Sequence, residues 1–241
     1  MTAAGPDTKS PTVVLVHGAF ADASSWNGVI ERLQAADLPV VAPAIPLRGV
    51  TSDSAYLADL LGELEGPVLA VGHSYGGAVI SNAAAKADNV LGLVFVAAFS
   101  PEEGETLGAA TADSKDAVLG AALVQHAYDD GIVELSIDPA KFREAFAADL
   151  PAEQAAVMAA TQRPIGAAGF SDASAAVAWK TLPSWAVVAT GDKAAGTDVT
   201  RTMATRAGAK ITEVDASHVV MVSQPQAVTG VILEALDAVS S

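Results

Sequence analysis

The sequence predicts an α/β fold: a doubly wound, mostly parallel sheet with a mainly helical cap inserted after the fourth predicted strand. Valine-rich apolar runs without polar alternation indicate strands that are covered on both faces, as in parallel sheets. Stretches with helical apolar spacing separate these runs, as expected when helices cover both sides of a sheet. A chain of 241 residues, 51% of them hydrophobic, can bury one large core.

Six apolar runs are the predicted strands. Four lie in the first part of the chain, and the alternation resumes near its end. The runs are TVVLVH (12–17), PVVAPAI (39–45), PVLAVGH (67–73), VLGLVFVAAF (90–99), WAVVATG (185–191) and KITEVDA (210–216).

Amphipathic patterns between the runs predict the helices. Apolar residues at i, i+3, i+4 and i+7 form one face of a helix. This spacing occurs twice before the third strand, and a final helix follows the last strand. The residues concerned are Trp26, Val29, Ile30 and Leu33, then Leu57, Leu60, Leu61 and Leu64, and finally Val228, Val231, Ile232, Ala235, Leu236 and Val239.

Residues 101–180 break this rhythm and form the expected cap, between core segments 1–100 and 181–241. The stretch is rich in alanine and has helix starts at Pro139 and Pro151. Proline suits the first helical position because its missing N–H would have no partner there. Ligands bind at the carboxyl ends of the strands in such sheets, so we expect the cap to cover the site at that edge.

Composition narrows the function classes. The formal net charge is −15 and no basic run is present, which disfavours nucleic acid and anionic lipid as partners. The absence of cysteine excludes disulfides, thiolate catalysis and sulfur-ligated metals. Apolar runs reach only about ten residues, whereas a bilayer span needs roughly 20. The start, MTAAGPDTKSPT, lacks the charged and apolar regions of a signal peptide, so we expect a cytoplasmic protein.

The motif GHSYG places Ser74 between Gly72 and Gly76, where the third strand ends and a helix from Tyr75 to about Ala85 begins. A serine on so sharp a turn takes a strained conformation that exposes its hydroxyl, and the glycines let strand and helix approach closely. The helix N-terminus offers free N–H groups where negative charge develops in acyl transfer. The alternative is an ordinary turn in which the serine only caps the helix. Its position after the third strand favours a nucleophile.

A serine hydroxyl is a weak nucleophile at neutral pH and needs a base within hydrogen-bond reach. His73 adjoins the serine and should point away from it, His17 ends the first strand, and His126 lies in the cap. His218, between the last strand and the last helix, fits the chain order serine, acid, histidine. A lone loop histidine without a catalytic role is the alternative, but we predict His218 as the base.

The acid that orients the base should precede it, at a strand end. Asp192, in ATGDKAAG directly after the fifth predicted strand, fits best. Asp198 is expected in the first turn of the next helix and Asp215 on the histidine's own loop. Glu102 and Glu103 would be an acid position one strand earlier. An exposed loop carboxylate is the alternative interpretation of each.

Acyl transfer also needs donors for the oxyanion, and backbone N–H groups are fixed before the charge arrives. The expected donors are the N–H of Tyr75, after the serine, and that of Ala19, at the end of the first strand. Gly18 allows the turn at Ala19, and His17 is expected to brace this loop.

These residues resemble the α/β-hydrolase superfamily, and within it the small esterases similar to plant methyl-salicylate esterases and hydroxynitrile lyases. The resemblance implies a cofactor-free enzyme in which Ser74, Asp192 and His218 match the triad, and Ala19 and Tyr75 the oxyanion donors. The matching pieces span most of the chain outside the cap: VLVHGAF, ASSW, GHSYGG, FVAAFSP, ATGDK and SHVVMVSQP.

The resemblance also implies a substrate pocket between cap and sheet. Its floor would be formed by Phe20, Tyr75, Phe99 and Val219, each of which could equally be ordinary core. The hydroxynitrile lyases that this chain resembles share a threonine at the position of Gly18 and a lysine at the position of Val219. Both lyase-type polar groups are absent, which favours hydrolysis. The cap sequence departs widely from the plant enzymes and leaves the substrate open.

We therefore predict a serine hydrolase that cleaves small to medium uncharged carboxylic esters through an acyl-enzyme. One alternative is another reaction on the same triad: cofactor-free perhydrolase or haloperoxidase-type activity, carbon–carbon cleavage or lyase chemistry. The other is a binding protein that kept the fold without catalysis. The expected partner is a small-molecule substrate, and a homodimer is a possible assembly.

Overall fold

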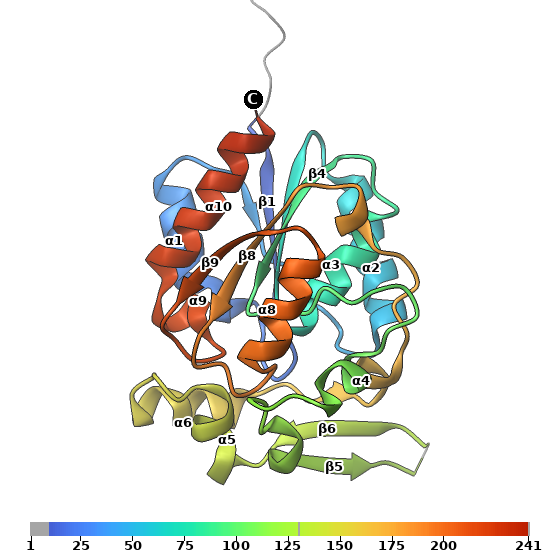
Figure 1. Cartoon of the computed structure of the whole chain (residues 1–241), viewed down its shortest axis with the longest axis vertical. Helices are drawn as coiled ribbons and strands as arrows, with labels where there is room; N and C mark the ends of the chain where they lie inside the picture. The colour runs from blue at the N-terminus through green and yellow to red at the C-terminus, as the bar shows by residue number, and fades with distance from the viewer. Residues whose placement is uncertain (1–9, 130, 241) are drawn as a thin grey trace, which may run out of the picture.

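The structure, a computed structural model, describes residues 10–129 and 131–240 and confirms the predicted α/β fold (Figure 1). Six strands form a parallel central sheet in the order β2-β1-β3-β4-β8-β9. Their bounds are Val40–Val41 (β2), Thr12–Val16 (β1), Val68–His73 (β3), Val90–Val96 (β4), Ser184–Ala189 (β8) and Lys210–Val214 (β9).

Helices cover both faces of this sheet (Figure 1). One face carries α1 (Asn27–Ala35) and α10 (Pro225–Val239), which pack together, with the short elements η1 (Ala23–Trp26) and α9 (Val220–Ser223) beside them. The other face carries α2 (Val50–Glu63), α3 (Tyr75–Ala84) and α8 (Thr197–Arg206). None of the helices described has the length and apolar character of a membrane span.

The middle of the sheet is buried because its strands are apolar on both faces. All six residues of β3 are buried. Val71 pairs with Leu15 of β1 on one side and Val94 of β4 on the other, and all three side chains are fully buried. This central packing fixes the carboxyl ends of β1, β3 and β4 along one edge, where the predicted site residues follow.

Two predicted strands are shorter than expected. The run 39–45 forms a strand only at Val40–Val41, because Pro43 has no N–H for the ladder and β2 is the edge strand of the sheet. The run 90–99 stops pairing after Val96, since Ala97 takes a positive φ of 43° and turns the chain out of the sheet. The segment that follows β4 then leads into the cap.

The cap lies across the carboxyl edge of the sheet and contains more β structure than expected (Figure 1). A small antiparallel sheet, β5-β6-β7, accompanies its helices. Sequence reasoning missed the hairpin, although Val133, Leu135 and Ile137 alternate with polar residues at the strand period of two. The elements are α4 (Leu107–Ala112), η2 (Leu119–Ala122), β5 (Leu123–Ala127), β6 (Val133–Ile137), α5 (Pro139–Phe146), α6 (Ala152–Thr161), β7 (Ile165–Gly166), α7 (Ala168–Ser171) and η3 (Ala178–Lys180).

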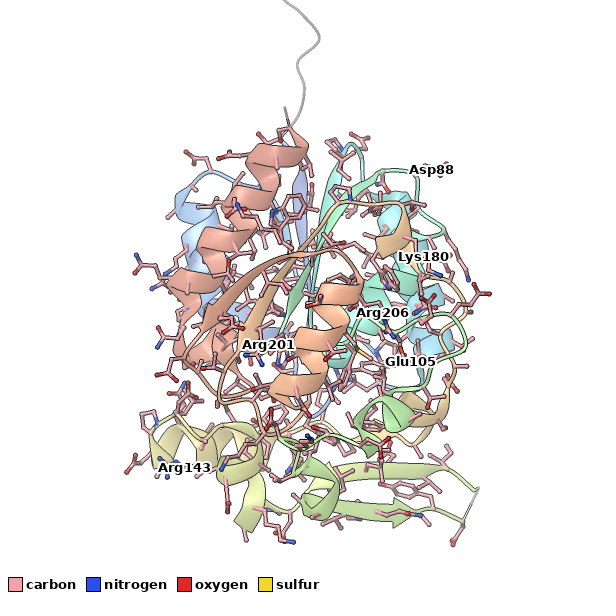
Figure 2. All side chains as sticks on the ribbon, in the orientation of Figure 1. Asp88, Glu105, Arg143, Lys180, Arg201 and Arg206 are labelled. Atoms are coloured by element: carbon pink, nitrogen blue, oxygen red, sulfur yellow. The ribbon has the colours of Figure 1, made fainter. Side chains whose placement is uncertain are left out.

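The segments that enter and leave the cap are attached to the core. Figure 2 shows Glu105 beside Arg206 of α8, and their side chains form an ion pair with an N–O distance of 2.6 Å. The Arg206 guanidinium also lies over the Trp179 ring, whose Nε1–H donates to the Pro101 carbonyl at 3.0 Å. Asn82 of α3 accepts backbone hydrogen bonds from the returning chain through its side-chain oxygen. These contacts seat the cap on the sheet.

Candidate active site

Ser74 occupies a strained turn between β3 and α3. Its φ of 52° and ψ of −122° lie in a region that L-residues rarely adopt, as expected of a serine held on a sharp strand-to-helix turn. The backbone is fixed on both sides: the Ser74 N–H donates to the Val96 carbonyl at 3.2 Å, and the Ser74 carbonyl accepts from Gly77 and Phe99. The strain is therefore held in place by β4 and by the first turn of α3.

Glycines make this turn possible because there is no room for side chains. A Cβ added at Gly72 would lie 2.5 Å from the Gly76 carbonyl oxygen, and one at Gly76 would lie 2.6 Å from that of Val16. A Cβ at Gly18 would lie 2.8 Å from the Cβ of Ser74. The turn thus needs glycine on either side of the serine and in the neighbouring loop.

His218 and Asp192 form a buried pair at the ends of β9 and β8. The His218 Nδ1 lies 2.8 Å from Asp192 Oδ2, and the side chains are 1% and 0% exposed. The other carboxylate oxygen accepts the N–H groups of Ala194 and Ala195 at 2.9 and 3.0 Å. A carboxylate oxygen accepts hydrogen bonds, so Nδ1 is the donor in this pair, and in a neutral imidazole Nε2 then carries the free lone pair.

Ser74 and His218 border the same cavity. They belong to the wall of a single chamber of about 440 Å³ between the sheet and the cap. No hydrogen bond joins the Ser74 Oγ to the imidazole within the described chain. Catalytic hydrogen bonds of this kind are often long before substrate binds.

The two expected oxyanion donors flank Ser74. Ala19 and Tyr75 are both buried and border the same cavity. Neither backbone N–H donates a hydrogen bond to another of the described residues. Phe20, directly after Ala19, has a positive φ of 61°, so this loop too is held in an unusual conformation. Two unpartnered N–H groups beside a strained serine could receive a negatively charged oxygen.

The other histidines are accounted for by structural hydrogen bonds. His17 Nε2 accepts from the Ile45 N–H at 3.0 Å and its Nδ1 lies 2.9 Å from the Gly18 carbonyl, so it braces the loop before Ala19. Burial lowers its pKa. His126 lies on the exposed strand β5, where its Nε2 is 3.1 Å from the Ser136 hydroxyl.

His73 supports the loop of His218. Its Nε2 donates to the His218 carbonyl at 3.0 Å, and the two rings lie 4.7 Å apart between centroids. Burial, reinforced by the neighbouring His218, holds the pKa of His73 well below its usual value. His73 is therefore a neutral donor to the loop of His218, and no hydrogen bond joins it to the serine hydroxyl among the described residues.

The alternative acids lie elsewhere. Glu102 forms an exposed ion pair with Lys180, and Glu103 is exposed. Asp198 accepts from the Ser114 hydroxyl at the start of α8. Asp215 is exposed on the loop of the histidine. Among the five candidate carboxylates, Asp192 alone contacts the imidazole of His218 in the described chain.

Sequence reasoning missed a buried carboxylate beneath the nucleophile turn. The Tyr75 hydroxyl donates to Asp53 Oδ2 at 2.7 Å, and the Arg48 N–H lies 3.2 Å from both carboxylate oxygens. Asp53 is fully buried on α2. Burial raises the pKa of Tyr75, and the Asp53 carboxylate adds to the shift. Asp53 lies in the polar run TSDS (51–54), and nothing in this run signals a contact with Tyr75.

The cavity is mostly apolar, and the cap supplies much of its wall. Phe20, Tyr75 and Phe99 line it as expected, whereas Val219 is fully buried and does not. No lysine, arginine, aspartate or glutamate lines the described wall, and no described cluster of three or more acidic or histidine side chains could hold a metal. The cap residues that sequence reasoning could not name are Gly108, Thr111, Ala112, Ala117, Val118, Leu119, Gly120, Ala121, Leu123, Leu135, Phe146 and Phe170.

Solved structures with this architecture come from bacteria and plants. A pyrethroid hydrolase from Sphingobium faniae JZ-2 is 23% identical with a TM-score of 0.78, over 95% of this chain and 98% of that one. The methylesterase protein MES16 from Arabidopsis is 19% identical with a TM-score of 0.79, over 94% and 99%. Tomato methylketone synthase I, in complex with 2-tridecanone, is 20% identical with a TM-score of 0.77, over 95% and 98%.

These likenesses establish the shared fold across nearly the whole length of each protein. A comparison with curated proteins finds no match. The sequence model of the alpha/beta hydrolase family, in contrast, matches residues 13–231, which include the strained serine turn, Asp192 and His218. The chain therefore belongs to the alpha/beta hydrolase family.

Proposed function

We propose that this protein is a serine esterase that cleaves neutral, largely apolar carboxylic esters through an acyl-enzyme. The observation that carries the proposal is the buried hydrogen bond between Asp192 and His218, on the cavity that Ser74 also borders. The esterases among the solved structures of the same fold, a pyrethroid hydrolase and a methylesterase, agree with this activity.

In the proposed mechanism, Ser74 Oγ attacks the carbonyl carbon of the ester while His218 Nε2 takes the hydroxyl proton. The carbonyl oxygen becomes an oxyanion that accepts hydrogen bonds from the N–H groups of Ala19 and Tyr75. His218 then gives its proton to the leaving alcohol, which leaves the acyl group on Ser74. Water attacks this acyl-enzyme while His218 takes its proton. His218 then returns the proton to Ser74 Oγ as the bond from Oγ to the acyl carbon breaks, and the carboxylic acid departs.

Asp192 would act by holding the imidazole. Because Oδ2 accepts the proton on Nδ1, the lone pair of Nε2 stays available for the serine proton. The negative charge of Asp192 also stabilises the imidazolium that forms during each step. The N–H groups of Ala194 and Ala195 keep the carboxylate in this orientation.

The character of the wall supports a neutral substrate. A chamber of about 440 Å³ without charged wall residues would leave the charge of a carboxylate or ammonium group unpaired. Aromatic and aliphatic side chains would instead bury an aryl or alkyl group. Lyase chemistry has less support, because this chain has Gly18 and Val219 where the hydroxynitrile lyases that it resembles have a threonine and a lysine.

Labelling with a fluorophosphonate, followed by peptide mass mapping, tests nucleophile and reaction class together. We expect the label on the peptide that contains Ser74, a burst of p-nitrophenol from p-nitrophenyl esters, and loss of both in Ser74→Ala. Ester turnover that survives in Ser74→Ala would refute the proposal. Faster turnover in a hydrogen peroxide assay would favour a perhydrolase, and tight ligand binding without turnover a binding protein.

A further inference from the structure

The loop of His218 is held by the core on one side and by the cap on the other. The core contacts are the Asp192 carboxylate on Nδ1 and the His73 ring on the backbone carbonyl. From the cap, Phe146 of α5 packs against the imidazole, with 5.0 Å between ring centroids and a 59° angle between the planes. The cap thus contacts the proposed base directly.

A second contact from the cap reaches the residue directly before the base. Ser217 is buried, and its hydroxyl donates a hydrogen bond to Asp149 Oδ1. Asp149 stands on the turn between α5 and α6, 68 residues earlier in the chain. On the other side of Ser217, the Ala216 carbonyl accepts from the Gly191 N–H at 3.0 Å, next to Asp192.

The turn that carries Asp149, residues 147–150, is itself braced. The Arg143 side chain of α5, visible in the cap in Figure 2, donates through Nε to the Leu150 carbonyl at 3.1 Å. The Leu150 N–H closes the turn on the Ala147 carbonyl at 3.1 Å. Because these two hydrogen bonds fix the turn, the Asp149 carboxylate can hold the Ser217 hydroxyl in one position.

The acceptor is charged at neutral pH. Burial raises the pKa of the Asp149 carboxyl, but the hydrogen bonds that surround it, with the Ser217 hydroxyl the strongest of them, together outweigh burial, so the pKa lies below its ordinary value. Hydrogen bonds to an ionised acceptor are shorter and roughly twice as strong as neutral ones. Such a bond restrains the loop more than a contact between two neutral groups would.

We propose that Asp149 is a positioning residue for His218, acting through the Ser217 hydroxyl, so that the turn 147–150 of the cap helps to set where the general base stands. The inference rests on the proposed role of His218 as base. A misplacement of about 1 Å in a catalytic group can lower the rate roughly 100-fold, so a restraint one residue away from the imidazole matters for turnover.

A matched pair at position 217 tests the hydroxyl apart from packing. Ser217→Thr and Ser217→Val add the same branched bulk, but only threonine keeps the donor. We expect kcat to fall roughly 10-fold or more in Ser217→Val relative to Ser217→Thr, with KM changed less than kcat. Asp149→Ala should lower kcat similarly, and add nothing further in the Ser217→Val background, since the two residues act as one unit. Asp129→Ala, a carboxylate at the exposed hairpin of the cap, is the control.

A readout that needs no turnover is the low-field proton NMR signal of the His218 Nδ1–H. We expect it to persist in Ser217→Thr and to broaden in Ser217→Val and Asp149→Ala, while thermal unfolding confirms that each variant is folded. Equal kcat and equal low-field signals in the threonine and valine variants would overturn the positioning role. If those variants agree while Ser74→Ala and His218→Ala are inactive, the positioning role fails and the esterase proposal stands. Ester turnover that survives in Ser74→Ala or His218→Ala would refute the esterase proposal itself.

Discussion

Asp192 and His218 face each other at 2.8 Å with almost no exposure to solvent, although they follow two different strands of the sheet. Because both side chains are buried, this hydrogen bond fixes the orientation of the imidazole and makes Nδ1 the donor. The remaining oxygen of Asp192 is already committed to two backbone N–H groups. The carboxylate therefore has no freedom to turn away from the histidine.

Asp192→Asn should lower kcat by about 10⁴-fold, because the amide would favour the wrong tautomer of His218. The measurement is the steady-state hydrolysis of a p-nitrophenyl ester. Asp215→Asn, which changes an exposed carboxylate on the loop of the histidine, is the control and should keep near-normal activity. Near-normal activity in Asp192→Asn would direct attention to Glu102, Glu103, Asp198 or Asp215 as the acid.

Gly72→Ala should destabilise the fold by roughly 1–3 kcal/mol, because the new Cβ would overpack against backbone atoms. The nearest of these, the Gly76 carbonyl oxygen, would lie 2.5 Å away. Gly62→Ala is the matched control: it lies in α2 with no described heavy atom within 4 Å of the new Cβ. There alanine should raise the free energy of unfolding by roughly 0.4–1 kcal/mol. Urea unfolding measures both, and equal effects at the two positions would contradict the close approach of strand and helix.

Tyr75→Phe should cost roughly 1–3 kcal/mol of stability while leaving kcat within a few-fold, because the proposed oxyanion donor is the backbone N–H. The variant leaves the fully buried Asp53 carboxylate with the Arg48 N–H as its remaining donor among the described residues. Tyr56 is an exposed tyrosine on α2, the helix of Asp53. The control variant Tyr56→Phe should therefore change the free energy of unfolding by less than about 0.5 kcal/mol. Loss of activity in a stable Tyr75→Phe protein would instead give the phenol a part in the reaction.

Stability should fall as the pH drops from about 7.5 to about 5.5, because the ordinary histidine pKa of about 6.5 applies to the unfolded chain. His17 and His73 have lowered pKa values in the folded protein, so the unfolded state binds more protons in this window. Each of these two histidines can add up to about 1.4 kcal/mol per pH unit to the slope of the free energy of unfolding against pH. Urea unfolding at several pH values measures the slope, which should be shallower in His73→Gln and in His17→Gln. Above about pH 7.5 both rings are neutral in either state and their contribution vanishes. A slope unchanged in both variants would show that neither ring is held neutral.

The uncharged wall of the cavity predicts strong discrimination between a neutral ester and a charged ester of similar size. The p-nitrophenyl ester of monomethyl succinate should be cleaved with a kcat/KM at least roughly 100-fold higher than that of succinate itself, whose free carboxylate would be buried without a partner. The two acyl groups differ by one methyl group and one charge. Comparable kcat/KM values for the two esters would mean that a cation of the protein reaches the bound substrate.

The sequence determined the features that depend on neighbours in the chain. Fully apolar valine-rich runs require cover on both faces, so the strands were predicted close to their observed bounds, apart from the early ends at Pro43 and Ala97. The glycines around Ser74 are needed because the turn leaves no space for side chains. The positive φ of Ser74 and the close contacts that a Cβ at Gly72 would make explain this requirement. The chain order of serine, acid and histidine matched the pattern of the α/β-hydrolases, which the sequence resembles.

Only the tertiary structure decided contacts between distant residues. The sequence favoured Asp192 among five carboxylates because it directly follows a predicted strand, but only the pairing of β8 with β9 brings it to His218. The Tyr75–Asp53 and Ser217–Asp149 hydrogen bonds join residues 22 and 68 positions apart, so they exist only once α2 and the cap are packed. The cavity wall has the same origin, because weakly patterned cap residues become a binding surface only through their position over the sheet.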